Sequence, residues 1–400
     1  MMKIGIIRET KTPPDSRVCL PPKHCKNILE KHKDISIVVQ PSESRCFTNK
    51  EYEQAGISLQ EDLTECDILL GVKEVKIPTL IEDKTYFFFS HTIKKQPYNK
   101  DLLRNVLAKK IQLVDYETLT DAEEKRVIAF GRWAGIVGAH NGILTWGKRT
   151  KKFDLKPMNQ CFDFNEAKSY YANLNLEGLK IVLTGTGRVS HGAAEVLDEM
   201  NIKKLSAEDF LNYEGNEAVY TMLPTELMFA KDADGTFDND FYKNPTNYHA
   251  TMQRYLQKGN LLINGIYWDN KAPSLFTLDE MKKANFGIKV IADITCDIAP
   301  VASIPSTIKA STIANPIFGF NVTTHQETEP HKEGVVDMMT VDNLPNELPR
   351  DASEDFGNQF IEHVLPELFN NKTDMIYRAS ITTKKGTLNK PYLYLADYVA

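Results

Sequence analysis

The chain has 400 residues, 42% of them hydrophobic and 26% charged, and carries a formal net charge of −6 at pH 7. This length exceeds what one hydrophobic core usually supports, so we expect two domains. The acidic balance disfavours nucleic acid or an anionic membrane as a partner, and no apolar run reaches the roughly 18 residues of a membrane-spanning helix. The first residues, MMKIGIIRETK, lack the apolar core of a signal peptide, so we expect a cytoplasmic protein.

Strand-like and helix-like segments alternate along the first third of the chain, which predicts a mostly parallel sheet with helices on both faces. Strands are expected at 3–9, 35–42, 67–74, 86–91 and 111–117, and helices at 21–33, 49–56 and 98–110. The strand at 86–91 begins with four consecutive aromatic residues, YFFF, and ends in a histidine.

A long segment at 126–148, rich in small and apolar residues, predicts a helix that leads into a second domain, with glycines that permit close packing. A second α/β block follows, interrupted by two acidic stretches that we interpret as surface insertions, and a last amphipathic segment is expected to pack back on the first domain. The expected strands are 180–185, 261–267 and 289–295, the helices 190–200, 249–259, 277–285 and 353–370, and the insertions 231–247 and 325–334.

The predicted fold class is therefore α/β, with two Rossmann-like, doubly wound parallel-sheet domains and a cleft between them. We assign residues 1–130 and 335–400 to the first domain and residues 131–334 to the second. The six cysteines occur singly, without a CxxC pair or a spacing typical of zinc ligands, so we expect free thiols and no bound metal.

The segment KIVLTGTGRVSHGAAEVLDEM carries the strongest local motif. Gly185, Thr186 and Gly187 follow an apolar strand, and Gly192 lies near the start of a helix, which is typical of a turn that binds the pyrophosphate of a dinucleotide. The spacing is longer than the common GxGxxG, so the pattern by itself is weak. The cofactor's ribose is ambiguous: Glu208 and Asp209 would favour NAD, whereas a serine with nearby lysines at 203–206 would favour NADP.

Polar residues follow several of the expected strands. Lys73, His91 and Glu117 each end a strand of the first domain, Arg17 follows the first strand, and Asp297 follows a buried strand of the second domain. Each alone is more commonly a solvated group or a group at the edge of a core. Because ligands bind at the carboxyl ends of strands in a doubly wound sheet, together they predict an acid–base site.

The chain resembles the lysine–2-oxoglutarate reductase branch of the saccharopine dehydrogenase (lysine-forming) family, within the alanine dehydrogenase and transhydrogenase fold group. The resemblance spans nearly the whole chain and lies in these blocks: ETKTPPDSRVCLPP, DILLGVKEV, YFFFSHTIK, LVDYETL, RVIAFGRWAGIVGAHNGI, VLTGTGRVSHGA, LLINGIYW, IADITCDI and VDNLPNELPRDASEDFG. It implies that the first domain binds substrate and the second the dinucleotide. The saccharopine-cleaving half of the longer bifunctional relatives is absent here, so we expect a stand-alone reductase. We also expect no paired cysteines near the cofactor.

The resemblance also implies roles for single residues. It implies that Lys73 and His91 are the acid–base pair and that Glu117 tunes their charge. The implied substrate-binding residues are Arg17, Lys94, Arg126 and Phe130. The implied cofactor contacts are Gly185, Thr186, Gly187, Arg188, Val189, Gly192, Asn343 and Asp297, the last beside the nicotinamide.

The expected reaction joins L-lysine to 2-oxoglutarate through an imine, which NADH or NADPH reduces to saccharopine, or runs in reverse. The substrate ε-amine has a pKa of roughly 10.4 and must lose a proton before it attacks, so a base is required. The three substrate carboxylates suit arginine and lysine. Alternatives are an alanine-dehydrogenase-like enzyme that uses ammonia, a non-catalytic nucleotide sensor, and a subunit that works with a separate saccharopine dehydrogenase.

Overall fold

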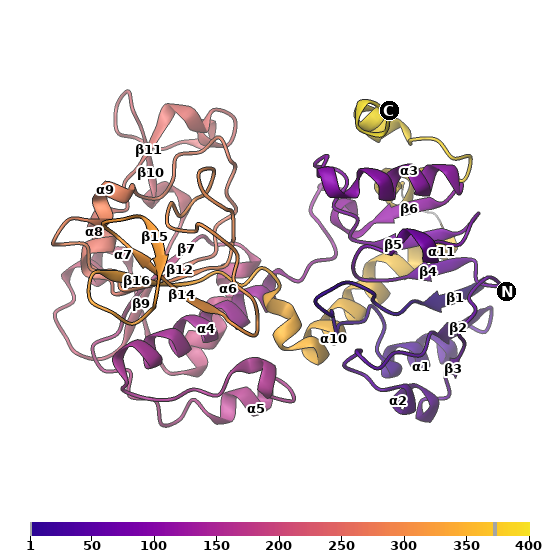
Figure 1. Ribbon diagram of the computed structural model, residues 1–400, viewed down its shortest axis with the longest axis horizontal. Coiled ribbons are helices and arrows are strands. Elements are labelled where there is room, and N and C mark those ends of the chain that lie inside the picture. The colour runs from indigo at the N-terminus through magenta and orange to yellow at the C-terminus, as the bar shows by residue number, and fades with distance from the viewer. Residues whose placement is uncertain (1, 371–373) are drawn as a thin grey trace. The chain divides into compact units, whose positions relative to one another are not determined.

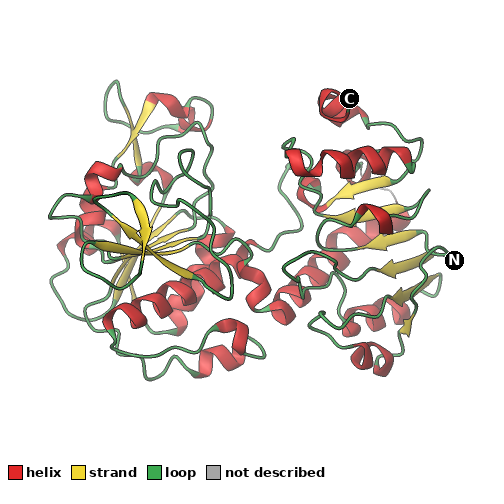
Figure 2. Ribbon diagram, viewed as in Figure 1, coloured by secondary structure: helices red, strands yellow, loops and turns green. Residues whose placement is uncertain are grey.

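The computed structural model describes residues 2–370 and 374–400, and its chain divides into two units, Met1–Phe130 with Pro349–Ala400, and Gly131–Leu348. In each unit a largely parallel sheet lies among helices (Figures 1 and 2), so the predicted α/β class is confirmed. Among the described helices, none combines the length and the apolar run needed to cross a lipid bilayer.

The first unit contains a six-stranded sheet in the order β3-β2-β1-β4-β5-β6, and every strand pair in it is parallel. The strands are β1 (Met2–Ile6), β2 (Ile35–Val39), β3 (Ser58–Leu59), β4 (Ile68–Leu70), β5 (Thr85–Phe88) and β6 (Gln112–Asp115). The helices are α1 (Pro22–Lys31), α2 (Asn49–Gln54), α3 (Lys100–Ala108), α10 (Pro349–Gln359), α11 (Leu365–Asn370), α12 (Met375–Ala379) and α13 (Ala396–Val399).

The second unit contains an eight-stranded sheet in the order β15-β14-β16-β13-β12-β7-β9-β8, in which β14 runs antiparallel to both of its neighbours and the other pairs are parallel, and a separate β10–β11 hairpin. The strands are β7 (Lys180–Thr184), β8 (Lys203–Leu205), β9 (Val219–Leu223), β10 (Phe229–Lys231), β11 (Tyr248–Ala250), β12 (Leu261–Asn264), β13 (Val290–Asp293), β14 (Ile317–Asn321), β15 (Gln326–Thr328) and β16 (Val335–Met339). The helices are α4 (Gly131–Thr150), α5 (Phe164–Ser169), α6 (Arg188–Glu199), α7 (Ala207–Asn212), α8 (Gln253–Lys258) and α9 (Leu278–Met281).

The boundary expected between residues 334 and 335 differs from the structure. Residues 335–348 belong to the second unit, because β16 pairs with β13 on one side and with β14 on the other. A strand inside a sheet cannot be separated from it without breaking two rows of backbone hydrogen bonds. The chain therefore re-enters the first unit at Pro349, where α10 begins.

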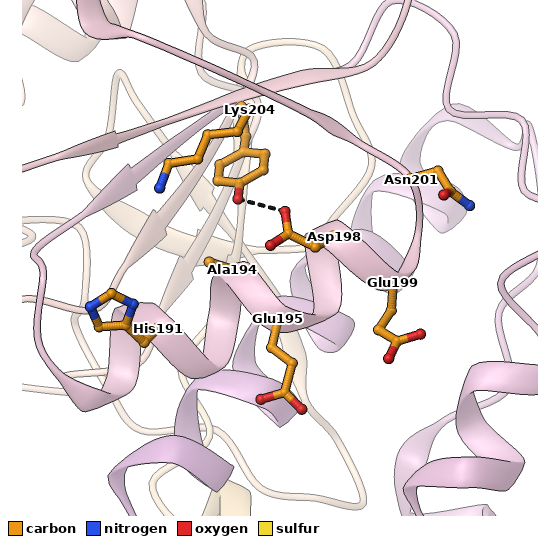
Figure 3. A pocket seen from close by; sticks show the side chains of 8 residues that line it. His191, Ala194, Glu195, Asp198, Glu199, Asn201 and Lys204 are labelled. Atoms are coloured by element: carbon orange, nitrogen blue, oxygen red, sulfur yellow. Dashed lines mark hydrogen bonds between the residues drawn. The ribbon is translucent and has the colours of Figure 1, made fainter.

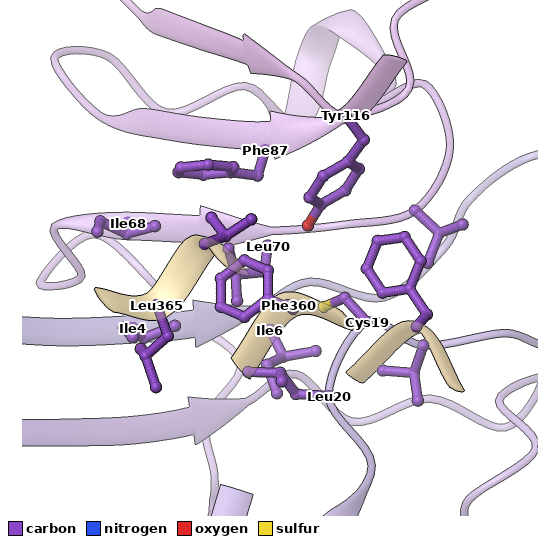
Figure 4. Close-up of a cluster of buried hydrophobic side chains, with 14 of the residues drawn as sticks. Ile4, Ile6, Cys19, Leu20, Ile68, Leu70, Phe87, Tyr116, Phe360 and Leu365 are labelled. Atoms are coloured by element: carbon purple, nitrogen blue, oxygen red, sulfur yellow. The ribbon is translucent and has the colours of Figure 1, made fainter. Parts of the chain in front are cut away.

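The aromatic strand β5 is buried on both faces of the first sheet. Phe87 and Phe89 belong to the core cluster on one face, together with Phe360 (Figure 4), whereas Tyr86 and Phe88 belong to the cluster on the other face. Successive side chains of a strand point to opposite faces, and a parallel sheet is covered on both, so an unbroken aromatic run fits here. Phe360 follows α10, so the last helical segment packs on the first unit as predicted.

The long helix α4 begins at Gly131, so the expected start at residue 126 is wrong. Arg126 instead forms a bridge with Thr120 in an extended segment. The prediction that glycines permit close packing is confirmed: a Cβ at Gly135 would lie 1.9 Å from the carbonyl oxygen of Val189, and one at Gly192 would lie 2.1 Å from that of Arg132. These two glycines let α4 and α6 touch backbone to backbone.

Candidate active site

The charged residues predicted in the first unit gather at one edge of its sheet. β1, β4, β5 and β6 are neighbours and all run in one direction, so the loops that follow them leave from the same edge. The chain order of the strands reverses between β1 and β4, and such a reversal is the point where doubly wound sheets bind ligands. Arg17 follows β1 and Lys73 follows β4, so both flank this point.

Arg17 is held rigidly below the surface. Its Nε and Nη2 donate to the two carboxylate oxygens of Asp15 at 3.0 and 2.6 Å, and its guanidinium lies 4.3 Å from the centre of the Phe130 ring. Phe130 in turn stacks on Phe356 of α10. Burial alone would raise the pKa of Asp15, but the charge and hydrogen bonds of Arg17 hold it well below its usual range. The pair is therefore a fixed, charged element of the edge.

Lys73 is poised to exchange a proton near neutral pH. Burial, followed by the positive charges of Arg17 and Lys11, lowers its pKa to about 8. The backbone N–H groups of Val72 and Lys73 both donate to the carboxylate of Glu9, at 2.6 and 2.9 Å. Burial, and then the charge of Asp15, raises the pKa of Glu9 to about 7. An amine and a carboxyl that both titrate near pH 7 to 8 lie in adjacent loops.

His91 is positioned by Glu74. Its Nδ1 lies 2.5 Å from Oε1 of Glu74, and Oε2 of the same carboxylate lies 3.4 Å from Nζ of Lys11. Burial would raise the pKa of Glu74, but the hydrogen bond and charge of His91 lower it to about 2. With Nδ1 engaged, Nε2 is the ring nitrogen left to meet a ligand. His91 also has a left-handed backbone, with φ of 52°, which is uncommon for a residue with a side chain and typical of functional turns.

Glu117 lies one strand further along, after β6. Its backbone N–H donates to Oδ1 of the buried Asp115 at 2.8 Å, and Asp115 also accepts from Ser90 at the end of β5. The carboxylate that pairs with His91 is Glu74, and the carboxylates that raise the pKa of Lys73 are Asp15 and Glu74. The role expected for Glu117, to tune the acid–base pair, therefore stays a prediction.

The remaining predicted substrate residues lie at the same end of the first sheet. Lys94 is exposed on the turn after β5. Arg126 donates from Nε to the carbonyl oxygen of Ile128 at 3.1 Å, and its guanidinium lies 5.7 Å from the ring centre of Phe89. Arg126 and Arg17 thus both lie over rings of one aromatic cluster, in which Phe89 contacts Phe130. The aromatic strand supports the cations of this edge.

Sequence reasoning missed the three carboxylates that organise this edge. All three lie in the motifs that the sequence had singled out: Glu9 and Asp15 in the same block as Arg17, and Glu74 directly after Lys73. The signal that could have pointed to them is an acidic residue directly beside a candidate base, as in Lys73-Glu74. It was not decisive, because adjacent charges are common on protein surfaces.

In the second unit the glycine turn lies between β7 and α6. Gly185 has φ of 86°, and a Cβ there would meet Ser190 and Ile266, so only glycine fits. Gly187 is the N-cap of α6 and has open space around its Cα, while Thr186 and Arg188 are exposed. The turn thus presents backbone and side chains to solvent at a helix N-terminus, which favours an anion such as a pyrophosphate.

Val189 and Gly192 lie in the same motif, but on the side of α6 that packs against α4. The carbonyl of Val189 meets Gly135 of α4, and Gly192 meets Arg132. The structure therefore brings Gly185, Thr186, Gly187 and Arg188 together as candidate cofactor contacts, whereas Gly192 is required for the packing of α6 on α4.

Asp297 and Asn343 lie after β13 and β16, which are neighbouring strands that run parallel to β7. Both residues are partly buried and lie in loops at the carboxyl edge of the second sheet, the edge from which the glycine turn also leaves. Asp293, at the end of β13, is buried and accepts hydrogen bonds from Asn264, Thr295 and Thr307, so it fixes this edge.

The strand order places neither of the two candidate sets of ribose-binding residues, Glu208 with Asp209 or the serine with lysines at 203–206, on the strand next to the glycine turn. β9 lies between β7 and β8, so Ser206, Glu208 and Asp209 follow an edge strand that does not pair with β7. The strand next to the glycine turn is β9, and the N–H of Gly185 donates to the carbonyl of Leu223 at 2.8 Å.

A wide groove along α6 is a poor candidate for the cofactor (Figure 3). It measures about 630 Å³, and its lining includes Glu195, Asp198 and Glu199 from α6 with Lys204 and Tyr220. Tyr220 donates to Asp198 at 2.7 Å. Three carboxylates against one lysine disfavour a phosphate group.

The chain matches, over residues 5–137, the family described as alanine dehydrogenase/PNT, N-terminal domain. It is 30% identical to alpha-aminoadipic semialdehyde synthase, mitochondrial, of Rattus norvegicus, over 98% of this chain and 47% of the relative, so the chain spans about half the length of that protein. It is 25% identical to saccharopine dehydrogenase [NAD(+), L-lysine-forming] of Yarrowia lipolytica, over 92% of this chain and 91% of the relative. A solved L-alanine dehydrogenase matches the whole chain with a TM-score of 0.65 at 14% identity, which shows the fold alone.

Proposed function

Because this chain is homologous to the lysine-forming saccharopine dehydrogenases, within the alanine dehydrogenase and transhydrogenase fold group, we propose that it joins L-lysine to 2-oxoglutarate, with NADH or NADPH as reductant, or catalyses the reverse reaction. The observation that carries the proposal is the group of proton-exchanging residues at the switch point of the first sheet. Lys73, with a pKa of about 8, lies there with Glu9, and His91 is aligned by Glu74.

The first step requires a base. The ε-ammonium of the substrate loses a proton, and the free amine adds to the ketone carbon of 2-oxoglutarate to form a carbinolamine. Lys73 suits the acceptor of that proton, because an amine with a pKa of about 8 is partly neutral at pH 7 to 8. Its neighbour Glu9, with a pKa of about 7, offers a second site for the proton.

The second step requires an acid at the same carbon. The hydroxyl of the carbinolamine leaves as water after it accepts a proton, and a C=N bond forms. The imidazole of His91 is suited to deliver this proton from Nε2, because Glu74 holds Nδ1 and fixes the orientation of the ring. A bound nicotinamide dinucleotide supplies the hydride that reduces the C=N bond, and the glycine turn of the second unit fits its pyrophosphate.

Substrate carboxylates are assigned to the cations of the same edge. Arg17 and Arg126 present planar donors that lie over aromatic rings, and Lys94 adds a charge on an exposed turn. Cations fixed over rings lose little freedom when they bind an anion, which favours affinity.

The experiment is a rate assay of the purified protein with each reduced cofactor, lysine and 2-oxoglutarate. We expect oxidation of the cofactor that requires both carbon substrates. His91→Ala and Lys73→Met should lower turnover by about 10²- to 10⁴-fold without unfolding the protein. Activity with ammonia and pyruvate but not with lysine would instead establish an alanine-type dehydrogenase, and binding without turnover would leave a nucleotide sensor.

We also propose that the protein works in the cytoplasm and that a separate saccharopine dehydrogenase uses its product. All six cysteines are free in the structure, which suits a reducing compartment. Recovery of the protein inside an organelle after cell fractionation would overturn the first statement. Failure to co-purify a saccharopine-cleaving activity under mild conditions would count against a stable complex.

A further inference from the structure

The second unit contains a buried carboxyl group that the proposed reaction does not use. Glu347 is the last residue of the short 3-10 helix η8 (Leu344–Glu347), which follows β16, and it is only 3% exposed. Glutamates are almost never fully buried unless they are paired, because water stabilises the charged form so strongly. The burial of Glu347 therefore calls for a physical explanation.

Two neighbouring segments hold this carboxyl group. Nδ2 of Asn141, on α4, donates to Oε1 of Glu347 at 2.8 Å. The backbone N–H of Asn159, in the 3-10 helix η4 (Met158–Gln160), also donates to the carboxyl group. Asn141 is itself buried. The side chain of Glu347 thus joins η8 to two other segments of the second unit.

The titratable groups of those two segments are engaged elsewhere. His140 of α4 is buried, with Nδ1 3.0 Å from the hydroxyl of Tyr171 and Nε2 2.9 Å from the carbonyl oxygen of Lys156. Burial lowers the pKa of His140 to about 4, so it is neutral at pH 7. On either side of η4, Nζ of Lys156 lies 2.5 Å from Oε1 of Glu166, and the thiol of Cys161 donates to a backbone carbonyl.

The remaining charges of the surrounding elements do not neutralise Glu347 either. Next to η8 in the chain, Asp342 is exposed, and Nη2 of Arg350 lies 2.8 Å from Oε1 of Glu51. The other charged residues of α4 lie near its ends, at Arg132, Lys148 and Arg149. Burial raises the pKa of Glu347 to about 7, although the hydrogen bonds from Asn141 and Asn159 oppose this rise. Among the described residues, Glu347 has no cationic partner.

η8 lies where the chain leaves the second unit. Leu348 is the last residue of that unit, and α10 begins at Pro349 in the first unit. α10 carries Phe356, whose ring stacks on Phe130, and Phe130 lies against the guanidinium of Arg17. A change in how firmly η8 is held therefore acts on the connection to a helix that supports the cationic edge of the first sheet.

We propose that Glu347 is a proton-dependent latch: its neutral form holds η8 against α4 and η4, and loss of its proton lets η8 and the connection to α10 open locally. An ionised carboxylate without a cationic partner is destabilising in a buried site, whereas water solvates it in an open segment. The latch makes one of the two chain connections between the units sensitive to pH. The proposal goes beyond the proposed reaction and does not depend on it.

The direction of the pH effect follows from the two states of the carboxyl group. Its pKa is about 7 when η8 is closed and about 4.5, the ordinary value, when η8 is open. The closed form therefore binds more protons between these two values, and opening becomes more favourable as the pH rises from about 4.5 to about 7. Above that range the effect levels off. Two such pKa values change the opening equilibrium by roughly 50-fold between pH 5 and 7.5.

The test is hydrogen–deuterium exchange of the full chain between pH 5 and 8.5, read by mass spectrometry and corrected for the intrinsic pH dependence of amide exchange. We expect protection of a peptide that spans residues 341–348 to fall roughly 10- to 100-fold between pH 5 and 7.5, whereas β7 keeps its protection. Glu347→Gln keeps the shape of the side chain without a titrating group, so its protection should not depend on pH. The matched control is Glu333→Gln, which removes an exposed glutamate of the same unit and should show the wild-type fall.

Constant protection of residues 341–348 in the wild type would overturn the latch, and so would an equal fall in Glu347→Gln. A fall shared equally by β7 would indicate global destabilisation and would also overturn it. If Glu347→Gln does not fold, Glu347→Met supplies a second neutral side chain of similar length, with the same expected result. No substrate or cofactor enters the experiment, so its outcome is separate from that of the proposed reaction.

Discussion

The lowered pKa of Lys73 can be tested by replacing one exposed neighbour, Lys11. Burial comes first among its causes, and the charges of Arg17 and Lys11 add to it, to give a pKa of about 8. At pH 7.5 roughly a quarter of such side chains are neutral, compared with about one in a thousand for an ordinary lysine with a pKa of about 10.5. Lys73 should therefore react with acetic anhydride at neutral pH far faster than an ordinary lysine of equal accessibility.

Replacing Lys11 by glutamine should raise the pKa of Lys73. The Lys11 side chain is 41% exposed and lies 3.4 Å from Glu74, so its charge acts through screening solvent. Interactions of such charges amount to about 0.2–1 kcal/mol, and one pKa unit corresponds to about 1.36 kcal/mol. The expected rise is therefore about 0.1–0.7 units. Loss of Lys11 also leaves Glu74 less neutralised, which acts in the same direction.

The assay is acetylation of the folded protein over a range of pH, with the yield at Lys73 read by peptide mass spectrometry. The matched control is Lys23→Gln, which removes an exposed lysine of α1 in the same unit. A midpoint for Lys73 near 10 in the wild type would refute the account of burial and charge. A midpoint that falls in Lys11→Gln would refute the assigned role of Lys11.

Three further variants probe other parts of the structure. Glu74→Gln keeps the shape of the side chain but removes the charge beside His91, so turnover should fall at least about tenfold. Stability should change by less than about 1 kcal/mol, because the pair is partly exposed. Unchanged turnover would remove Glu74 from the site. Gly192→Ala should cost about 1–3 kcal/mol in denaturant unfolding, since its Cβ would meet a backbone carbonyl at 2.1 Å, whereas Gly187→Ala, with open space at its Cα, should unfold like the wild type and bind ADP-ribose more weakly. Between pH 8 and 10.5, the free energy of unfolding of the wild type should rise by up to about 3 kcal/mol relative to that of Lys73→Met, because Lys73 binds more protons in the unfolded chain than in the folded one there. Parallel curves of unfolding free energy against pH for the two proteins would contradict this.

Much of the first sheet could be predicted from the sequence because its strands are short, apolar and separated by clear helical patterns. Alternation of faces explains how Tyr86 to Phe89 can all be buried, and the polar residues at strand ends fall on one edge as parallel pairing requires. These inferences depend on local sequence and on the direction of the strands, both of which a single sequence expresses.

The second unit shows where local reasoning stops. β9, β14 and β16 were not predicted, and the position of β9 beside β7 decides which residues lie near the glycine turn. Strand order is fixed by packing between distant segments, so no local pattern reports it. The β10–β11 hairpin was interpreted as solvent-exposed because its surface aspartates dominate the composition, while a few aromatic residues form its core.

The account's central claim is that this chain forms a bond between the ε-nitrogen of lysine and the ketone carbon of 2-oxoglutarate and then reduces it. The most direct measurement supplies lysine with heavy nitrogen at the ε position, unlabelled 2-oxoglutarate and a deuterated reduced nicotinamide cofactor, and examines the product by mass spectrometry. The account predicts saccharopine that contains both the heavy nitrogen and one deuterium, and no such product from Lys73→Met with His91→Ala. Consumption of the cofactor without doubly labelled saccharopine would contradict it.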